Sequence, residues 1–475
     1  MESKGYVKEN HTNSKVAAKA GLWYTICNFL FKGMVFLTTP VFTRLMSKDE
    51  LGNFSNFSAW ASILLIFTSL DLAQSVIRSK LEHEKDMDSY VWSILAFSTI
   101  WTFIVYGLVC TFSAFFVNIF QTEMKYIHVM FLYLLTAPAY TMLITKHRAF
   151  YKYKLFVALT GIMTVSGTLL SVILVSFLQD KLAGRILGYY IPYILIGAVI
   201  FIHLFVKGKR VNTSYWKYAC VICIPLVPHV LSLYLLSSSD KVIITKLCGA
   251  EYTALYSVAY SAYHIVTILF DSMNKAWAPW LLESLHNKKY SEIRKLSKVY
   301  ISIFVLLIIA VLLFVPEIIW ILGGEQYAEA VYCLPPLITS CVFQFIYTMY
   351  VNIEFYEKKT FGVSVATMLA TAVNIVLNLI FIPINSEYSY VIAAYTTLAG
   401  YIILFILHFF IVKKMGMGHV YDIRFIVGIF CIVMMVSGVM NMLYGMRGWR
   451  YIAAGGYCVS VLYLIYRYKG ILKVL

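Results

Sequence analysis

Charged residues are scarce in this chain, and their scarcity excludes an ordinary water-soluble globular domain. Only 13% of its 475 residues are Asp, Glu, Lys or Arg, whereas 61% are hydrophobic, and the mean hydropathy is +0.77. Soluble domains typically carry about 25% charged residues. Apolar stretches of about 20 residues, long enough to cross the hydrocarbon core as a helix, recur along the whole chain. The composition therefore indicates an all-α polytopic membrane protein.

The motifs of soluble enzymes and nucleotide-binding proteins are also missing. The sequence has no G-x-x-x-x-G-K-[ST] phosphate loop, no G-x-G-x-x-G turn and no H-E-x-x-H zinc motif. Its nine cysteines are scattered, and ordinary helix packing explains the one close pair, Cys220 and Cys223. We therefore expect no catalytic residue, no metal site and no cofactor. Without an ATP site, uphill transport would need an ion gradient or the gradient of the substrate itself.

Fourteen apolar segments are predicted to be transmembrane helices joined by short outer loops. With a cytoplasmic N-terminus, the inner segments carry 29 Lys and Arg residues and the outer loops 9, and Lys32 lies inside the first helix. This bias obeys the positive-inside rule, so both termini are expected in the cytoplasm and the net charge of +16 does not imply a nucleic-acid partner. The predicted helices are residues 20–42, 54–77, 90–117, 126–145, 156–178, 185–206, 219–238, 253–274, 299–322, 330–353, 361–382, 389–412, 425–443 and 450–466.

A long-range repeat indicates that the fold arose by duplication. Residues 42–55 return in altered form 202 positions later, at residues 244–257, and Phe150-Tyr151 returns as Phe355-Tyr356 at a spacing of 205. This period spans six predicted helices, an even number, so both copies share one membrane orientation. We expect an N-terminal six-helix lobe, a parallel C-terminal lobe and two added helices, over residues 1–212, 213–418 and 419–475, respectively.

A cation in the middle of the first predicted helix suggests a wet cavity or a buried ion pair. Lys32 shares a polar stripe with Asn28. A cation at the bilayer centre costs roughly 2.5–3.5 kcal/mol, so Lys32 must either pair with an acid or face a cavity. In the second case it would meet an anionic substrate, with Asn28 beside it.

A row of tyrosines on the eighth predicted helix suits either a sugar or the membrane interface. Tyr256, Tyr260 and Tyr263 fall on one face, followed by Asp271. Tyrosine offers an apolar ring face and a polar hydroxyl, which suits sugar rings, but interfacial belts use it as well. We expect the three tyrosines to contact a glycan and Asp271 to be a candidate for ion coupling.

Further polar residues lie within the predicted membrane helices of both halves, and we expect them to line a shared cavity. Asp240 and Lys241 would either neutralise each other or contribute charge, and a histidine would either relay a proton or bond to a neighbour. The additional candidates for substrate binding are Arg78, Asn374 and Asn378, and those for ion coupling are Asp71, His229 and Asp240.

Two stretches resemble the Wzx-type polysaccharide flippases. Residues 235–244, reading LLSSSDKVII, and Tyr256-Ser257-Val258-Ala259-Tyr260 are similar to the family's seventh-to-eighth helix segment. Residues 39–45, reading TPVFTRL, and Glu50-Leu51-Gly52 are similar to its first-helix exit. The resemblance covers essentially the whole chain and implies a MATE-like architecture.

The resemblance also implies a function. Members of the family flip undecaprenyl-pyrophosphate-linked oligosaccharides across the bacterial plasma membrane by alternating access, for capsule, O-antigen or exopolysaccharide assembly. The implied partners are this lipid-linked substrate, membrane lipids, H⁺ or Na⁺, a polysaccharide polymerase and a chain-length regulator. A cationic lumen would fit Lys32, Arg78 and Lys241.

Three other functions stay open at this point. A multidrug antiporter of the same superfamily would need deep acidic residues in the first lobe, where this chain has Lys32. A lipid II flippase is a second close alternative. A membrane glycan polymerase is a remote one, because such an enzyme needs a sizeable outer loop and this chain has only short ones.

Overall fold

The computed structural model describes residues 23, 30, 33–34, 36–150, 152–384 and 388–467, which form helices and short connections without any strand. The chain divides into two compact units, residues 1–254 and 255–475. The expected division into 1–212, 213–418 and 419–475 stays a prediction.

After a helical stretch at residues 36–45, the main helices are α2 (Lys48–Ser69), α3 (Ser75–Glu82), α4 (Met87–Thr111), α5 (Ser113–Phe120), α6 (Met124–Ala149), α7 (Tyr153–Phe177), α8 (Lys181–Gly208), α9 (Thr213–Cys223), α10 (Val227–Leu247), α11 (Ala250–His286), α12 (Tyr290–Leu313), α13 (Val315–Gly323), α14 (Leu334–Tyr356), α15 (Thr360–Phe381), α16 (Ser389–Lys414), α17 (Ile423–Leu443) and α18 (Arg447–Arg467).

The predicted all-helical membrane fold is confirmed, but the predicted count of fourteen spans is not. Eleven of the described helices are long and apolar enough to cross a membrane, and the bent pair α2 and α3 raises the number to twelve. The predicted helix at 20–42 lies largely outside the described residues. The predicted helix at 450–466 corresponds to α18, which is not among the candidate spans.

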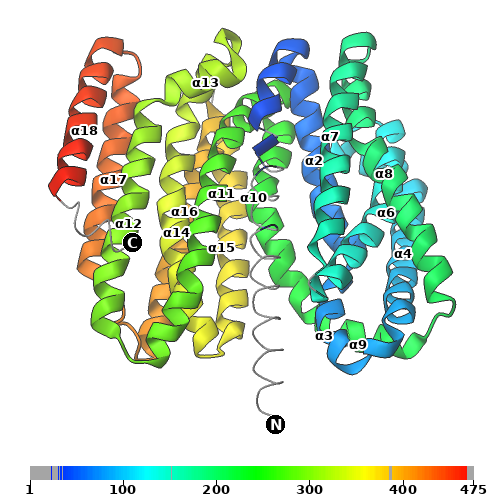
Figure 1. Ribbon diagram of the computed structural model, residues 1–475. Helices are drawn as coiled ribbons and strands as arrows, with labels where there is room; N and C mark the ends of the chain where they lie inside the picture. Colours follow the sequence, from blue (N-terminus) through cyan, green and yellow to red (C-terminus); the bar gives the residue numbers. More distant parts are fainter. Residues whose placement is uncertain are drawn as a thin grey trace. The chain divides into compact units, whose positions relative to one another are not determined.

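Close helix contacts hold the first unit together, and small residues make them possible. Helix α8 packs against both α6 and α7, and α2 packs against α10 (Figure 1). Gly184 and Gly188 form a G-x-x-x-G pattern on α8, facing α7. A methyl group added at Gly188 would lie 2.3 Å from the Cα atom of Ser171, so only glycine permits this approach. Small residues play the same role in many membrane helix pairs.

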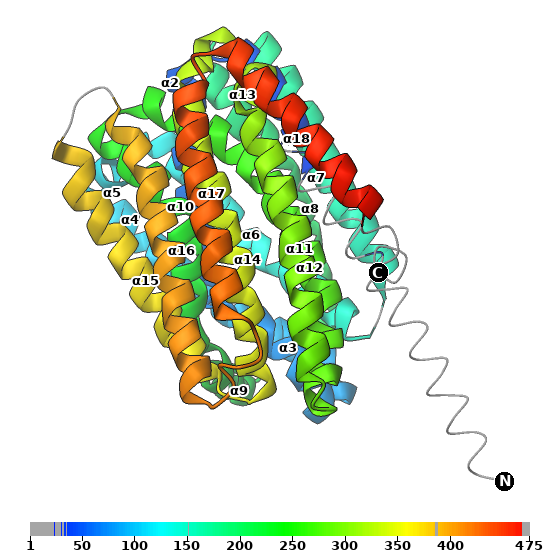
Figure 2. The ribbon, with the colours of Figure 1, turned by 90° about the vertical axis from the view of Figure 1, so that its left-hand side faces the viewer.

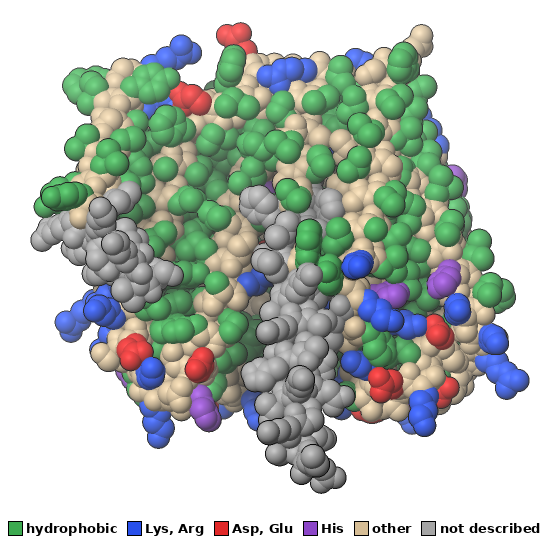
Figure 3. Space-filling view, in the orientation of Figure 1, with side chains coloured by type: hydrophobic (Ala, Val, Ile, Leu, Met, Phe, Trp, Pro, Cys, Tyr) green, Lys and Arg blue, Asp and Glu red, His purple; other side chains and the backbone are tan. Residues whose placement is uncertain are grey.

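The second unit is a bundle in which α14 and α16 form the most extensive contact. Helix α15 packs on α16, and α12 and α17 pack on α14 (Figure 2). Phe343 on α14 stacks on Phe430 on α17 with ring centroids 3.9 Å apart. On the face drawn in Figure 3, hydrophobic side chains lie along the helices, and most Lys and Arg side chains lie towards the helix ends. This distribution is the one expected for helices immersed in lipid.

Breaks interrupt several of the predicted spans, and two of these breaks differ in their sequence signal. The span predicted at 219–238 is interrupted by a 3₁₀ turn at Ile224–Leu226, which contains Pro225 and lies next to Pro228. The span predicted at 54–77 bends by 57° between α2 and α3 without glycine or proline at the bend. There Leu70 and Asp71 both adopt the left-handed conformation, with φ of 50° and 46°.

Candidate functional site

The sequence-predicted site residues divide between the two units, and two of them lie outside the described part of the chain. Asn28 and Lys32 are not among the described residues, so their role as a polar, cationic cavity surface stays a prediction. Asp71, Arg78, His229 and Asp240 lie in the first unit. The second unit holds Asp271 and the remaining candidates, which are Tyr256, Tyr260, Tyr263, Asn374 and Asn378.

Asp71 sits at the bend of the α2–α3 span. Its backbone N–H donates to the Ser69 hydroxyl at 3.2 Å, and its buried Oδ2 atom has no hydrogen-bond partner among the described residues. Non-glycine residues in the left-handed region store strain of order 1–3 kcal/mol each, and such residues cluster at functional sites. The structure therefore adds backbone strain to the sequence argument for Asp71.

Arg78 lies one turn into α3 and is exposed. Its Nε atom is 3.7 Å from the Glu82 carboxylate, in an i,i+4 pair with both side chains substantially exposed. Such exposed pairs contribute little to stability, typically below about 1 kcal/mol. Arg78 is thus accessible to a ligand at the end of the first unit that the charge distribution predicts to be cytoplasmic.

The first repeat and the beginning of the second meet at one rim of the first unit. Gly52 on α2 lies against Ala250, and a methyl group added at Gly52 would overlap the Ala250 carbonyl at 1.7 Å. On the neighbouring α10, Asp240 is fully buried, and the Thr245 hydroxyl lies 2.8 Å from that of Thr253. The close approach of α2 to the first residue of α11 requires a small residue at position 52.

The structure reveals a cation in this unit that the sequence interpretation did not single out. The guanidinium carbon of Arg185 on α8 lies 3.5 Å from the ring centroid of Phe42 and 4.4 Å from that of Phe54. Its Nε atom is buried and has no hydrogen-bond partner among the described residues, while the side chain as a whole is partly exposed. Cation–π contacts of this kind hold an arginine without neutralising its charge. Phe42 and Phe54 both belong to the repeated stretch, but nothing in the sequence links them to Arg185.

Four tyrosines continue from Arg185 along α8 and onto α6. Tyr189 lies 5.7 Å from the Arg185 guanidinium, and its ring packs against Tyr190 and Tyr193 at 5.0 and 5.2 Å. Tyr133 on α6 is the fourth member of the group, and its ring centroid lies 5.0 Å from that of Tyr190. Tyr133, Tyr189 and Tyr193 are partly exposed. This group combines one cation with flat aromatic faces and hydroxyls, the chemistry that recognises a sugar carrying an anionic group.

The three predicted tyrosines of the second unit do form a row, but their side chains are buried. Tyr256, Tyr260 and Tyr263 follow one another with ring centroids 5.8 and 4.9 Å apart, and each is at most 4% exposed. The Tyr263 hydroxyl donates to the Gln344 carbonyl oxygen at 3.0 Å, and the Gln344 amide donates to the Tyr401 hydroxyl at 3.2 Å. In this conformation the row is part of the helix packing, and glycan contact by these tyrosines stays a prediction.

The polar stripe on α15 is also buried, where it faces α16. Thr396 on α16 donates to the Asn378 side-chain carbonyl and lies 3.5 Å from the Asn374 amide. Asn374 and Asn378 are both fully buried. This network satisfies polar groups inside the unit, as buried polar groups require, so a substrate would reach it only after α15 and α16 separate.

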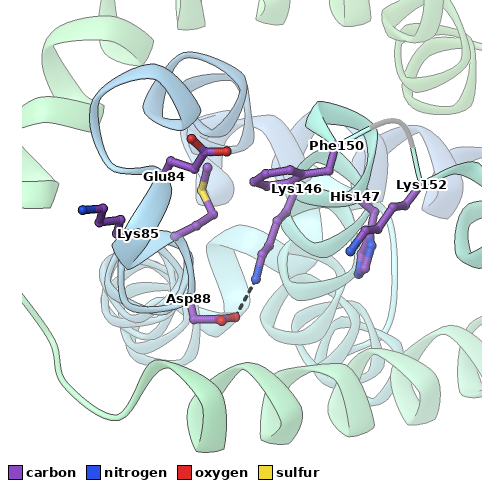
Figure 4. Close-up of a pocket in the computed structure, with 8 residues that line it drawn as sticks. Glu84, Lys85, Asp88, Lys146, His147, Phe150 and Lys152 are labelled. Carbon is purple, nitrogen blue, oxygen red and sulfur yellow. Dashed lines mark hydrogen bonds and ion pairs between the residues drawn. The ribbon is translucent and has the colours of Figure 1, made fainter. Parts of the chain in front are cut away.

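One cavity of about 280 Å³ lies at the end of the first unit that the charge distribution predicts to be cytoplasmic (Figure 4). Lys146 points towards Asp88 and pairs with it at 2.5 Å, while Lys85 points away from that pair. The cavity suits an anionic group at the level of the lipid headgroups. It is lined by Glu84, Lys85, Met87, Asp88, Lys146, His147, Phe150 and Lys152. Among the residues that the structure describes, no group of His, Cys, Asp and Glu side chains is placed to hold a metal ion.

Comparisons with known proteins agree with this architecture. Lsg locus putative protein 1 of Haemophilus influenzae is 24% identical over 370 residues, covering 75% of this chain and 88% of that protein. The lipid II flippase MurJ in an inward closed conformation superposes with a TM-score of 0.70 at 14% identity, covering 95% of this chain and 100% of that chain. An inward-facing multidrug resistance MATE transporter of the MOP superfamily gives a TM-score of 0.57 at 12% identity, covering 82% and 94%. At these identities the two structures establish a shared fold.

The family follows from the sequence itself. The model of a family described as polysaccharide biosynthesis protein matches residues 17–285, which include both copies of the repeated stretch. This match confirms the family indicated by the motifs around residues 39–52 and 235–260. Because the matched region is more than half of the chain, this protein belongs to the polysaccharide biosynthesis protein family.

Proposed function

We propose that this protein flips a polyprenyl-pyrophosphate-linked oligosaccharide from the inner to the outer leaflet of the bacterial plasma membrane by alternating access. Family membership makes polysaccharide assembly the pathway class, and the fold is shared with a lipid flippase and with transporters of the MOP superfamily. A transporter without a catalytic centre suffices for this step. The termini lie in the cytoplasm in this proposal, as the positive-inside bias indicates.

The observation that carries the proposal is the group formed by Arg185 and the tyrosines around it. A pyrophosphate needs a cation that is not already neutralised, and Arg185 is held by aromatic rings. Sugar rings need flat apolar faces with hydroxyls nearby, and Tyr189 and Tyr193 present both next to that cation. Lys32 and Asn28 on the first predicted helix would add to this surface. The basic cavity around Lys85 and Lys152 would contact anionic lipid headgroups.

The test is rescue of a bacterial strain that lacks its own repeat-unit flippase. Expression of this protein should restore surface polysaccharide, measured by immunoblotting with an antibody against the glycan, if the donor strain's glycosyltransferases are supplied. A strain lacking its lipid II flippase and a strain lacking its drug-efflux pumps serve as parallel hosts. Rescue of viability in the former, or drug resistance in the latter without restored polysaccharide, would refute the proposal in favour of one of the two alternatives.

A polymerase and a chain-length regulator are expected downstream of the flipped product, because a repeat unit delivered to the outer leaflet must be joined to others. Co-purification of this protein with either of them from a native membrane would support the placement. This step does not require a catalytic group on the present chain.

A further inference from the structure

Two ionisable side chains form a pair in the interior of the second unit. Glu354 on α14 and His408 on α16 are both 0% exposed, and the Nδ1 atom of His408 lies 2.6 Å from Oε1 of Glu354. Both residues are near the helix ends that the charge distribution predicts to be cytoplasmic. Neither residue belongs to a stripe that the sequence singled out.

The two polar atoms of this pair that do not contact the other side chain lack hydrogen-bond partners among the described residues. Oε2 of Glu354 and Nε2 of His408 are both buried and have none among the described residues. A purely structural ion pair in a membrane interior is usually satisfied at every polar atom, because an unpaired buried group is costly. Gly362 on α15 lies against Glu354, and a methyl group there would be 3.6 Å from Oε2. Helix α15 therefore closes over the acidic side of the pair.

A polar connection runs from the pair towards α11. The ring of Tyr347 on α14 stacks on His408 with centroids 5.5 Å apart and planes 16° apart. One turn further, the Asn352 amide donates to the side-chain carbonyl of Asn274 at 2.8 Å. The polar face of α11 thus meets α14 beside the pair.

Further ionisable groups lie on the elements around the pair. Lys298 on α12 and Asp422 before α17 pair with each other at 2.6 Å. The turn from α14 into α15 donates a backbone N–H from Lys359 to the Glu354 carbonyl at 3.0 Å. Ionisable residues on the elements around the pair include His264, Asp271 and Lys275 on α11, Glu292, Arg294, Lys295 and Lys298 on α12, Glu325 and Glu329 in the 3₁₀ segment before α14, Tyr347 and Tyr350 on α14, Glu357, Lys358 and Lys359 in the turn before α15, Tyr401, Lys413 and Lys414 on α16, Asp422 before α17 and Arg424 on α17.

We propose that Glu354 and His408 form a proton-binding site whose occupancy is coupled to the conformation of the second unit, and this inference rests on the proposed transport function. In the closed state one proton lies between Oε1 and Nδ1 and another is on Nε2, so the pair is neutral. A further proton can bind Oε2 only when α15 moves away from α14 and α16 and water reaches the pair. Binding converts a neutral pair into one of charge +1, and release reverses it. Because only the more hydrated conformation binds the additional proton, a lower pH increases the population of that conformation, by thermodynamic linkage.

The test measures opening of the site without using the transported lipid. Gly362→Cys in the purified protein in nanodiscs is labelled with a membrane-impermeant maleimide between about pH 6 and about pH 8, the range in which histidine commonly titrates. The reagent's own pH dependence is divided out with a peptide thiol, and labelling of the parent protein is subtracted because the chain has natural cysteines. We expect corrected labelling to rise as pH falls, by at most about tenfold per pH unit for one proton.

Glu354→Gln and His408→Gln should each abolish this pH response. Glu357→Gln, one turn further along, and His419→Gln, an exposed histidine, are the matched controls and should keep it. The double variant Glu354→Leu with His408→Leu removes both buried polar groups and should fold, because apolar replacement of a whole buried pair is commonly tolerated. It should lose both the response and polysaccharide export, whereas retained export would overturn the proposal.

The remaining outcomes separate this site from the proposed function. A pH response that needs the pair in a protein that fails to rescue polysaccharide export would support the site and refute the flippase. Export with labelling that is independent of pH would refute the site and leave the flippase standing. Labelling that responds to Na⁺ and not to pH would also refute the proton site.

Discussion

Arg450 on α18 donates from both terminal nitrogens to the Glu317 carboxylate on α13 in a two-pronged ion pair. The second of these bonds measures 2.6 Å, and the Tyr451 hydroxyl donates to the same carboxylate at 2.8 Å. Arg450 is only 2% exposed, and it also donates to the Leu313 carbonyl at 3.3 Å. The bidentate geometry fixes orientation as well as distance. The last described helix is therefore anchored to the second unit by polar contacts.

Arg450→Met should destabilise the protein by leaving Glu317 without its partner. Breaking a fully buried pair costs about 3–5 kcal/mol, and the loss here should be smaller because Glu317 is 33% exposed. The measurement is thermal unfolding in nanodiscs. Arg447→Met, at the start of the same helix, is the control and should change little, and an unchanged melting temperature for Arg450→Met would contradict the anchoring role.

Gly188→Val should disrupt the contact between α7 and α8. The added side chain would collide with the backbone at Ser171, and overpacking of this kind typically costs about 1–3 kcal/mol. Gly107→Val on α4 is the control, because nothing lies within 4 Å of a methyl group placed there. Reduced recovery of folded protein on fluorescence-detected size exclusion should be seen for Gly188→Val alone. Equal recovery of both variants would show that α7 can shift to accept the side chain.

Arg185→Ala should reduce surface polysaccharide by about tenfold or more in the rescue assay, because hydrogen bonds to a charged group are worth about 1.5–3 kcal/mol. Arg185→Lys keeps the charge but loses the planar guanidinium, so an intermediate level is expected. Arg44→Ala removes an exposed arginine near the same end of the unit and is the matched control. Normal export by Arg185→Ala at normal protein levels would remove Arg185 from the substrate site.

Asp422 should make the stability of the second unit depend on pH. The hydrogen bond from Lys298, with further backbone bonds at the start of α17, lowers the pKa of Asp422 below its ordinary value. Its contribution is therefore complete above that ordinary value and is lost as the pH falls through the lowered pKa. The difference in melting temperature between wild type and Asp422→Asn should shrink below about pH 4. Lys298→Met should show the same trend, and a difference that stays constant through this range would contradict the assignment.

The helices of this protein could be predicted from hydropathy because the hydrocarbon core of a membrane restricts the backbone to helices and closed barrels. Every backbone N–H and C=O group in the hydrocarbon core must bond within its own segment or in a closed barrel. The thirteen predicted helices from 54–77 onwards each overlap helices of the structure. The G-x-x-x-G pattern at Gly184 and Gly188 was equally visible in the sequence, but which helix it faces was not.

The bend at Leu70 and Asp71 could not be predicted in this way. The break at Pro225 follows from the absence of a backbone N–H group in proline, which is a property of that residue alone. Leu70 and Asp71 have no such property, and their left-handed backbone persists because surrounding packing holds it. The buried state of Tyr256, Tyr260 and Tyr263 is likewise a tertiary result, because a helical stripe shows which residues share a face and not what covers that face.

The amino-acid sequence by itself determined the membrane environment, the helical fold, the internal duplication and the family of this protein, since each depends on composition, periodicity or local similarity. Tertiary structure alone decided that Arg185 lies over Phe42 and Phe54 and that Glu354 meets His408. Those partners are separated by 143, 131 and 54 positions in the chain. Contacts at such separations are set by how helices pack, and a cation or an acid reveals its chemistry only when its neighbours are known.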